Sequence, residues 1–90
     1  MRRRYIVSGR VQGVGFRQFT AEAGRGLGLS GWVRNLANGD VEAEAEGPED
    51  KILEFEKALR KGPGFGRVDS LKIDEVPATG GLPSPFDITR

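Results

Sequence analysis

Cysteine and histidine are both absent from the 90-residue sequence. Without cysteine there can be no disulfide framework and no thiol nucleophile, and this absence is compatible with a reducing compartment. Without histidine the common imidazole base is missing, and the two absences together remove the usual soft metal ligands. Any chemistry of this chain must therefore use arginine, lysine, side-chain amides, hydroxyls, carboxylates or backbone N–H groups.

Long apolar runs are absent as well. The apolar run Tyr5–Val7 is followed by Ser8, whereas the apolar core of a signal peptide needs about 7–15 residues and a membrane span needs about 20. We therefore expect a cytoplasmic protein that does not insert into a membrane.

Glycine is abundant, with 14 residues in the chain, which is about twice its usual share.

Charge is unevenly distributed, although the net charge is only +1. Residues 1–35 hold seven Arg and one acid, whereas residues 36–56 hold one Lys and eight acids. The early positive charge predicts an anion-binding region, although we expect Arg2, Arg3 and Arg4 merely to solvate the end of a strand.

Hydrophobic periodicity predicts a β-α-β-β-α-β order followed by a short final strand. The expected strands cover residues 4–8, 32–35, 41–46, 67–76 and 86–88, and the expected helices cover residues 16–27 and 48–61. Two helices on one face of an antiparallel sheet of four to five strands form the ferredoxin-like α+β sandwich. Because no internal linker or repeat interrupts the pattern, we predict one domain over residues 1–90.

The first predicted helix combines an apolar stripe with two unfavourable glycines. The residues of the stripe are Phe16, Phe19, Ala23 and Leu27. Gly24 and Gly26 each cost up to about 1 kcal/mol relative to alanine inside a helix, so we expect this helix to fray near its end. The loop at residues 77–85 carries no pattern that assigns it a role.

Residues 41–46 alternate strictly between apolar and acidic side chains, which fits a strand with one buried face. The acidic residues are Glu42, Glu44 and Glu46. Carboxylates in line along one strand do not converge on a single ion, so we expect a solvated outer face and not a hard-cation site.

The segment from Gly9 to Arg17 joins a predicted strand to a helix N-terminus and contains three glycines. Backbone N–H groups without intrahelical partners lie beside the positive end of the helix dipole, and Arg17 adds a planar fork for two phosphate oxygens. The segment matches neither a Walker A loop nor the GxGxxG pattern, because Gln18 stands where the third glycine would be. It indicates a nest for phosphate or carboxylate, or a plain tight turn beside a surface arginine.

Two signatures resolve that alternative. The segment Gly9-x-Val11-Gln12-Gly13-Val14-x-Phe16-Arg17 resembles the first signature of the acylphosphatase family, and Gly31-Trp32-Val33-Arg34-Asn35-x-x-x-Gly39-x-Val41, ending at Gly47, resembles the second. Both match without a gap and in the family's order. The family domain has the βαββαβ order and the length of the whole chain.

The resemblance implies an enzyme that hydrolyses the carboxyl–phosphate bond of acyl phosphates to a carboxylate and inorganic phosphate without a metal or cofactor. It implies that Arg17 binds the substrate phosphate and that Asn35 orients the attacking water. The implied cradle for the phosphate consists of the backbone amides of Gln12, Gly13, Val14, Gly15, Phe16 and Arg17. We expect a monomer that binds a small-molecule acyl phosphate, is inhibited by its product phosphate, and binds neither nucleic acid nor membrane.

Several assignments near the signatures have alternatives. Arg34 and Asn35 point to opposite faces of one strand, so only one can reach a common site, and we favour Asn35. Trp32 is expected to pack and not to stack on a ligand. The side chain of Gln12 can touch phosphate or fix the turn, and the sequence favours neither.

Two other functions are weaker. An RNA-recognition module has the same βαββαβ order, but it needs aromatic residues on its third strand, which here is acidic. A carbamoyl-phosphate-directed domain of a larger maturation protein is a further possibility within the family, which a chain of 90 residues does not favour.

Overall fold

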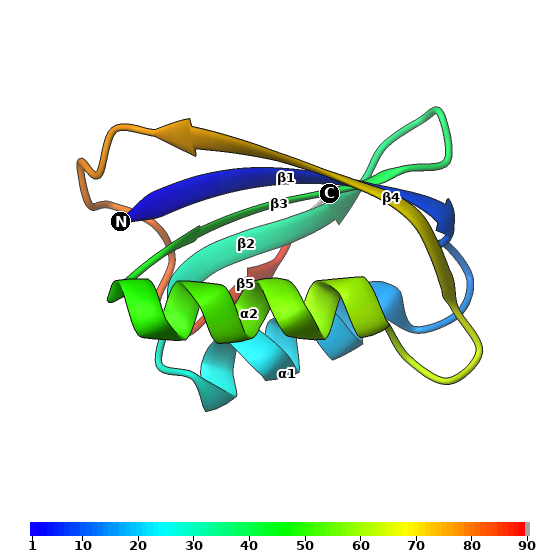
Figure 1. Cartoon of the computed structure of the whole chain (residues 1–90), viewed down its shortest axis with the longest axis horizontal. Helices are drawn as coiled ribbons and strands as arrows, with labels where there is room; N and C mark the ends of the chain where they lie inside the picture. The colour runs from blue at the N-terminus through cyan, green and yellow to red at the C-terminus, as the bar shows by residue number, and fades with distance from the viewer. Residues whose placement is uncertain (90) are drawn as a thin grey trace.

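The computed structural model describes residues 1–89, and both of its helices lie on one face of a single sheet (Figure 1). The strands are β1 Arg2–Arg10, β2 Ser30–Asn35, β3 Val41–Glu46, β4 Arg67–Val76 and β5 Asp87–Ile88, and the helices are α1 Phe16–Gly26 and α2 Glu49–Lys61. This order confirms the predicted ferredoxin-like α+β sandwich.

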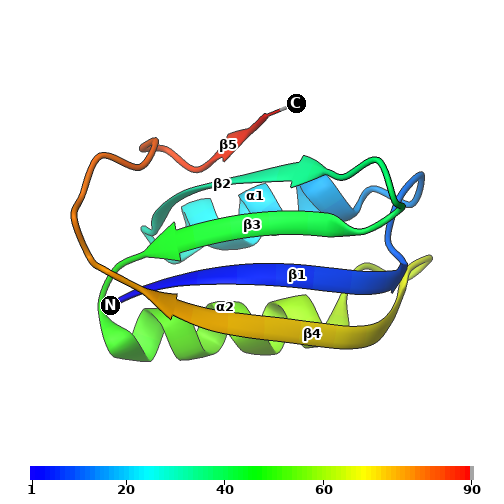
Figure 2. The same ribbon diagram turned by 90° about the horizontal axis from the view of Figure 1, so that it is seen from above.

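The strands form one mixed sheet in the order β4-β1-β3-β2-β5. The four strands β1 to β4 pair antiparallel as predicted, but β5 runs parallel to β2. The expectation of a wholly antiparallel sheet is therefore wrong for the fifth strand. Figure 2 shows the reason, because the segment after β4 passes around one end of the sheet and enters the far edge from the side where β2 begins.

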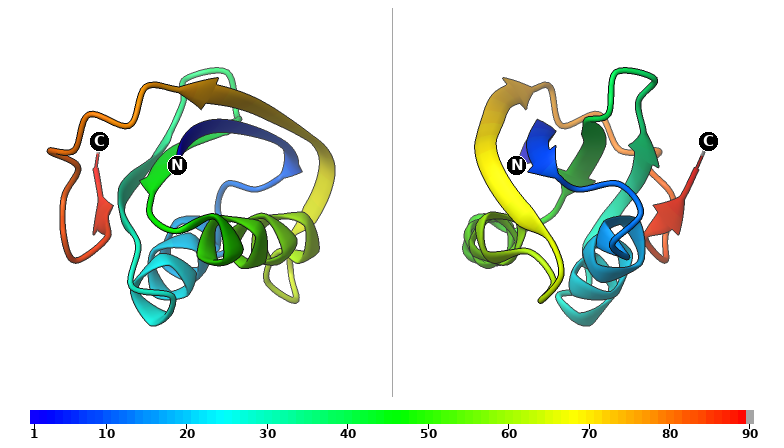
Figure 3. Two further views of the ribbon diagram at one scale, coloured as in Figure 1. Left: turned by 60° about the vertical axis from the view of Figure 1, so that its left-hand side comes forward. Right: turned by 90° about the vertical axis from the view of Figure 1, so that its right-hand side faces the viewer.

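The core fills the space between the sheet and the two helices, which lie next to each other under its curved face (Figure 3). Tyr5 and Val33 from the sheet and Ile52, Phe55 and Leu59 from α2 are completely buried. Among the described residues, no helix is long and apolar enough to cross a membrane.

Helix α1 is packed differently from the prediction. Its buried residues are Phe16, Thr20, Ala21 and Gly24. The other members of the predicted stripe, Phe19, Ala23 and Leu27, are only half-buried. The helix is rotated toward Gly24, because that residue lies directly against the ring of Phe86.

Gly24 and Gly31 make room for Phe86, whose side chain is completely buried. A Cβ atom added at either glycine would lie 2.3 Å from the Phe86 ring. Helix α1 stays helical to Gly26, so the expectation that it frays near its end is wrong. Packing against Phe86 outweighs the low helix propensity of glycine. The loop at 77–85, which had no predicted role, delivers this ring to the core.

The outer face of the sheet carries ion pairs and is not the solvated row of carboxylates that we expected. Glu42 is only 3% exposed and accepts hydrogen bonds from Arg4 at 2.5 Å and from Arg34, whose Nη2 lies 2.6 Å away. Glu44 pairs with Arg2. The physical reason is the strand order: β3 lies between β1 and β2, so its carboxylates have arginine-bearing strands on both sides. Opposite charges across neighbouring strands attract.

Arg3 points the other way, toward α2. Its Nη1 donates to Glu56 Oε2 at 2.7 Å, and the buried Tyr5 hydroxyl donates to the same oxygen at 2.9 Å. Burial and the hydrogen bond to Glu56 raise the pKa of Tyr5. The expectation that Arg2, Arg3 and Arg4 merely solvate a strand end is therefore wrong, because all three hold carboxylates of neighbouring elements.

Candidate active site

The loop between β1 and α1 turns on two glycines in the left-handed region. Gly13 has φ 75° and Gly15 has φ 78°. A Cβ at either position would meet nothing within 4 Å, so the backbone conformation, and not crowding, is what favours glycine here. Gly9 is different, because it lies in β1 and a Cβ there would be 2.2 Å from the carbonyl oxygen of Arg67. Gly9 thus serves the contact between β1 and β4 and lies outside the turn itself.

Helix α1 begins at Phe16 without a side-chain cap, and its N-cap is Gly15. The first turn contains no acidic residue. The N–H groups of this turn have no carbonyl partner within the helix, and they carry the positive end of the helix dipole. The start of α1 is therefore free to receive an anion.

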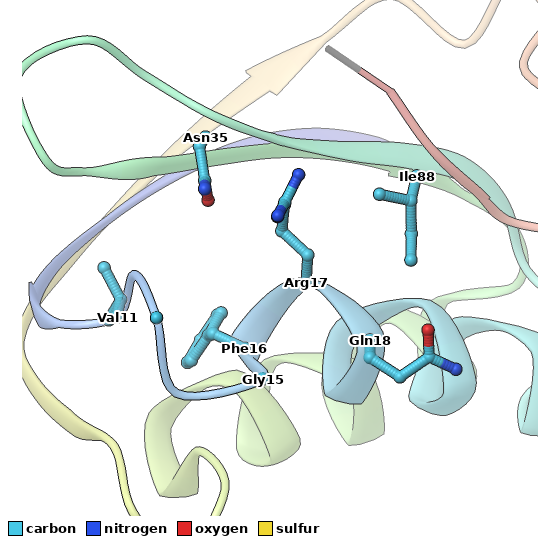
Figure 4. A pocket seen from close by; sticks show the side chains of 8 residues that line it. Val11, Gly15, Phe16, Arg17, Gln18, Asn35 and Ile88 are labelled. Atoms are coloured by element: carbon cyan, nitrogen blue, oxygen red, sulfur yellow. The ribbon is translucent and has the colours of Figure 1, made fainter.

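A pocket of about 240 Å³ opens where this turn faces the end of β2 (Figure 4). Its lining residues are Val11, Gly13, Gly15, Phe16, Arg17, Gln18, Asn35 and Ile88. Five of the predicted site residues thus line one pocket, although Arg17 and Asn35 lie 18 positions apart in the sequence. Of the predicted cradle, Gln12 and Val14 do not line the pocket, and Val14 packs against the core.

Asn35 ends β2 and lies on the inner face of the sheet, two residues after the buried Val33. Its Oδ1 atom is buried and has no hydrogen-bond partner among the described residues. Buried polar atoms in proteins are nearly always hydrogen-bonded. Figure 4 shows the side chain entering the pocket, so this oxygen is an acceptor that awaits a partner there.

Arg17 lies in the first turn of α1, and its guanidinium enters the same pocket from the helix side (Figure 4). Within residues 1–89 it has no carboxylate partner, in contrast to Arg4 and Arg34 on the outer face. A planar fork that is not neutralised can bind two oxygens of one anion. Arg17 and Asn35 thus present a cationic donor and a neutral amide to one small volume.

Arg34 and Trp32 lie on the opposite face of β2 from the pocket. Arg34 donates to Glu42, and its guanidinium carbon lies 5.3 Å from the centre of the Trp32 ring. Asn35, and not Arg34, therefore lines the pocket. Trp32 packs against Arg34 in a cation–π interaction, as its predicted packing role requires.

The side chain of Gln12 turns away from the pocket toward the loop between β2 and β3. Its Nε2 donates to the carbonyl oxygen of Leu36 at 2.8 Å and to that of Asp40 at 2.8 Å. The sequence favoured neither phosphate contact nor fixing of the turn for this side chain. The structure shows that it fixes backbone carbonyls. Any contact of Gln12 with an anion would come from its backbone N–H.

Three lining residues were missed by sequence reasoning. Val11 and Gln18 flank the predicted loop and could have been found by their position alone. Ile88 has no local signal, because it reaches the pocket only through the parallel pairing of β5 with β2, in which Val33 faces Ile88. Gln18 is tied to its own helix by a hydrogen bond from its Nε2 to Glu22 at 2.9 Å.

Comparisons with known proteins agree on one family. A family model described as acylphosphatase matches residues 3–88. The chain is 50% identical over 88 residues to an acylphosphatase of Nitratidesulfovibrio vulgaris (strain DP4), covering 97% of this chain and 88% of that protein. The crystal structure of acylphosphatase from Bacillus subtilis superposes with a TM-score of 0.94 at 39% identity, covering 99% and 98% of the two chains. An acylphosphatase from Coxiella burnetii gives a TM-score of 0.90 at 35% identity, covering 98% and 90%.

Proposed function

The chain belongs to the acylphosphatase family, and from that premise we propose how its own residues carry out the reaction. The activity is hydrolysis of the carboxyl–phosphate bond of a small acyl phosphate, which yields a carboxylate and inorganic phosphate. Arg17, Asn35 and the backbone of residues 12–17 each have a role in this reaction.

The phosphoryl group is held by the turn and by Arg17. The backbone N–H groups of residues 12–17 donate to its oxygens, and the start of α1 contributes the positive end of its dipole. The guanidinium of Arg17 binds two phosphoryl oxygens at once. Support comes from the two left-handed glycines, Gly13 and Gly15, from the uncapped helix start, and from the position of Arg17 in the pocket lining.

Asn35 holds the attacking water. The observation that carries this assignment is its buried Oδ1 atom, which has no partner among the described residues and faces the pocket. A water hydrogen-bonded to this oxygen is oriented with its own oxygen toward phosphorus. A neutral amide does this without repelling a dianionic substrate, as a carboxylate would. In-line attack at phosphorus depends mainly on positioning and on stabilising charge.

In the reaction step, the water oxygen bonds to phosphorus as the bond from phosphorus to the acyl oxygen breaks. The acyl group leaves as a carboxylate, and it is a good leaving group that needs no strong general acid. One proton of the water passes to a phosphoryl oxygen of the substrate itself, so the products are a carboxylate and dihydrogen phosphate. No ionisable side chain of the protein gains or loses a proton.

Four further properties belong to the same proposal. The reaction needs no metal, since the pocket presents N–H groups, a guanidinium and an amide, and its lining within residues 1–89 contains no carboxylate. Inorganic phosphate inhibits by occupying the substrate's place. The chain acts as a monomer. The lack of cysteine supports a place in the cytoplasm.

Nothing in the site favours the RNA-binding alternative. A base-stacking module would need exposed aromatic residues on the outer face of β3, where this chain has Glu42, Glu44 and Glu46. These carboxylates are paired with arginines of β1 and β2, so β3 offers no platform on which a base could stack.

The decisive experiment is hydrolysis of an aryl acyl phosphate such as benzoyl phosphate in the presence of a chelator. We expect turnover to persist with the chelator and inorganic phosphate to inhibit competitively. Absence of turnover in a folded sample would refute the proposed function, whereas turnover that chelation abolishes would refute only the metal-free reaction.

A further inference from the structure

We infer that Gln12 is a positioning residue: it joins the phosphate-binding turn to the loop that follows Asn35 and thereby sets the place of the attacking water. This inference rests on the proposed function, because it assumes that Asn35 holds that water. Gln12 itself contacts no reacting atom through its side chain, so it acts through Asn35.

The chemistry of the contact fixes which end of the amide is involved. Gln12 Nε2 lies 2.8 Å from each of two carbonyl oxygens, those of Leu36 and Asp40. Carbonyl oxygens only accept hydrogen bonds, so the amide NH₂ group and not its oxygen must face them. Both of its N–H bonds are used in this way. The side chain therefore has no donor left for a phosphate, and its remaining oxygen would repel one.

The two carbonyls belong to the first and last residues of the loop that connects β2 to β3, directly beyond the last pair of the β2–β3 ladder. That pair is Asn35 and Val41, and Leu36 directly follows the first while Asp40 directly precedes the second. The loop closes itself with a hydrogen bond from Leu36 N–H to Asp40 oxygen at 2.8 Å. The Leu36 oxygen likewise accepts a hydrogen bond from Gly39 N–H at 3.2 Å. Gln12 therefore adds a second donor to each of these two carbonyls from outside the hairpin.

Gln12 is separated from Leu36 by 24 residues and from Asp40 by 28, yet it lies immediately before Gly13 in the turn that receives the phosphate. The turn carries the proposed cradle, and the hairpin carries the proposed water ligand. In the described residues, the amide of Gln12 is a direct polar link between the two. Loss of that link would let the hairpin end shift relative to the phosphate, while each carbonyl could still bind solvent.

The expected effect is on turnover and not on phosphate binding. A displacement of about 1 Å in a reacting group can cost up to about 10²-fold in rate. For Gln12→Met, which keeps the chain length but removes both donors, we expect kcat for benzoyl phosphate to fall roughly 10- to 100-fold. The inhibition constant for inorganic phosphate should change less than about threefold, because the backbone N–H groups and Arg17 are retained.

A double-mutant cycle distinguishes positioning from simple loosening of the fold. Gln12→Met is measured in the wild-type chain and again in an Asn35→Ala chain. If Gln12 acts through Asn35, Gln12→Met should have almost no further effect once Asn35 is replaced. In the Asn35→Ala chain we therefore expect Gln12→Met to change kcat by less than about twofold. Equal losses in both backgrounds, wild-type turnover in Gln12→Met, or phosphate affinity that falls in parallel with kcat would each overturn the inference.

Folding is checked by circular dichroism and thermal unfolding of each variant. Gln12→Glu, which keeps the shape but places an oxygen against the two carbonyls, is the second variant should Gln12→Met not fold. In the wild-type background we expect Gln12→Glu to lose at least as much turnover as Gln12→Met. In the Asn35→Ala background we expect its loss to be as small as that of Gln12→Met. A wild-type chain that fails to hydrolyse benzoyl phosphate would instead refute the proposed function, so the two failures are distinct.

Discussion

The outer face of the sheet and the pocket at the end of β2 both contain arginine, but only on the outer face does the arginine pair with a carboxylate of the protein. On the outer face, Glu42 accepts hydrogen bonds from Arg4 and Arg34. In the pocket, Arg17 has no carboxylate partner within residues 1–89, and Asn35 Oδ1 is buried without a hydrogen bond. Two residues in succession, Arg34 and Asn35, point to these two environments from one strand.

The fold thus uses polar groups for stability on the outer face of the sheet and leaves those of the pocket available for a ligand. Burial disfavours the charge of Glu42, but the hydrogen bonds from Arg34 and Arg4 outweigh it and hold the pKa of that carboxyl below its usual value. Within residues 1–89 the pocket groups Arg17 and Asn35 have no such compensation. In the proposed reaction they gain partners when phosphate and water enter, and such contacts accelerate a reaction where they are stronger in the transition state than in the ground state.

The largest effect is expected for Asn35→Ala. Removing a group that orients the nucleophile should lower kcat by about 10²–10³, by analogy with the loss of one transition-state hydrogen bond. The free energy of unfolding should not fall, because Oδ1 has no partner to lose within residues 1–89. Steady-state kinetics with benzoyl phosphate and a urea titration measure the two quantities. Turnover at the wild-type rate would remove Asn35 from the mechanism.

A somewhat smaller loss is expected for Arg17→Lys. The ammonium keeps the charge but cannot bind two phosphoryl oxygens as a planar fork does. Loss of one charged hydrogen bond of roughly 1.5–3 kcal/mol corresponds to about 10- to 150-fold in kcat/KM. Inhibition by inorganic phosphate should weaken as well. A lysine variant that retains wild-type kcat/KM would show that bidentate binding is not used. Arg10→Lys, another exposed arginine near the turn, is the matched control.

The outer face should respond in stability and not in turnover. Glu42→Gln leaves Arg4 and Arg34 without their carboxylate, and we expect the free energy of unfolding to fall by about 1–3 kcal/mol. This is less than for a fully buried pair, because the arginine side chains are 43% exposed. The control is Glu54→Gln at the exposed pair with Lys57, which should cost less than about 0.5 kcal/mol. Equal costs for the two substitutions would contradict the importance of burial.

The same pair predicts a pH dependence of stability. Because the pKa of Glu42 is lower in the folded chain than its ordinary value of 4.5, the folded state binds the proton less readily than the unfolded state. The contribution of Glu42 is therefore fully present above about pH 4.5 and is lost as the pH falls through the folded pKa. The stability gap between the wild type and Glu42→Gln should accordingly narrow in acid. A gap that widens there would contradict the direction of the shift.

The smallest effect is expected in the pH profile of turnover. If the substrate phosphate accepts the water proton, kcat at saturating substrate should show no ionisation of the protein near neutrality. Turnover is measured between pH 5 and pH 8, with the ionisation of the substrate determined separately. A bell-shaped profile with two pKa values of the protein in this range would identify an acid and a base that the proposal lacks.

Local patterns were enough to predict the order of the elements and the glycine turn, and the resemblance to the family pointed to Arg17 and Asn35 as candidate site residues. Gly13 and Gly15 are glycines because their backbone is left-handed, and Arg17 follows them at the start of a helix. Asn35 shares a strand face with Val33. Such relations depend on spacing along a few residues, which is why sequence reasoning found them.

The predictions that failed depend on which distant segments meet. The pairing of Glu42 with arginines of two other strands was not visible along β3, and neither was the contact of Gly24 with Phe86. In both cases the local rule was correct in isolation: carboxylates favour solvent, and glycine disfavours helices. The tertiary structure overrode it by placing a specific partner beside the residue.

The order of strands and helices, the glycine turn, and the candidates Arg17 and Asn35 could all be found in the sequence. The packing of distant segments was needed to show that β5 adds Ile88 to the pocket, that Phe86 fills the space left by two glycines, and that Gln12 binds the hairpin beyond Asn35. The physical reason is that backbone conformation and amphipathic spacing act over a few residues, whereas strand order and close packing bring together segments more than 20 residues apart.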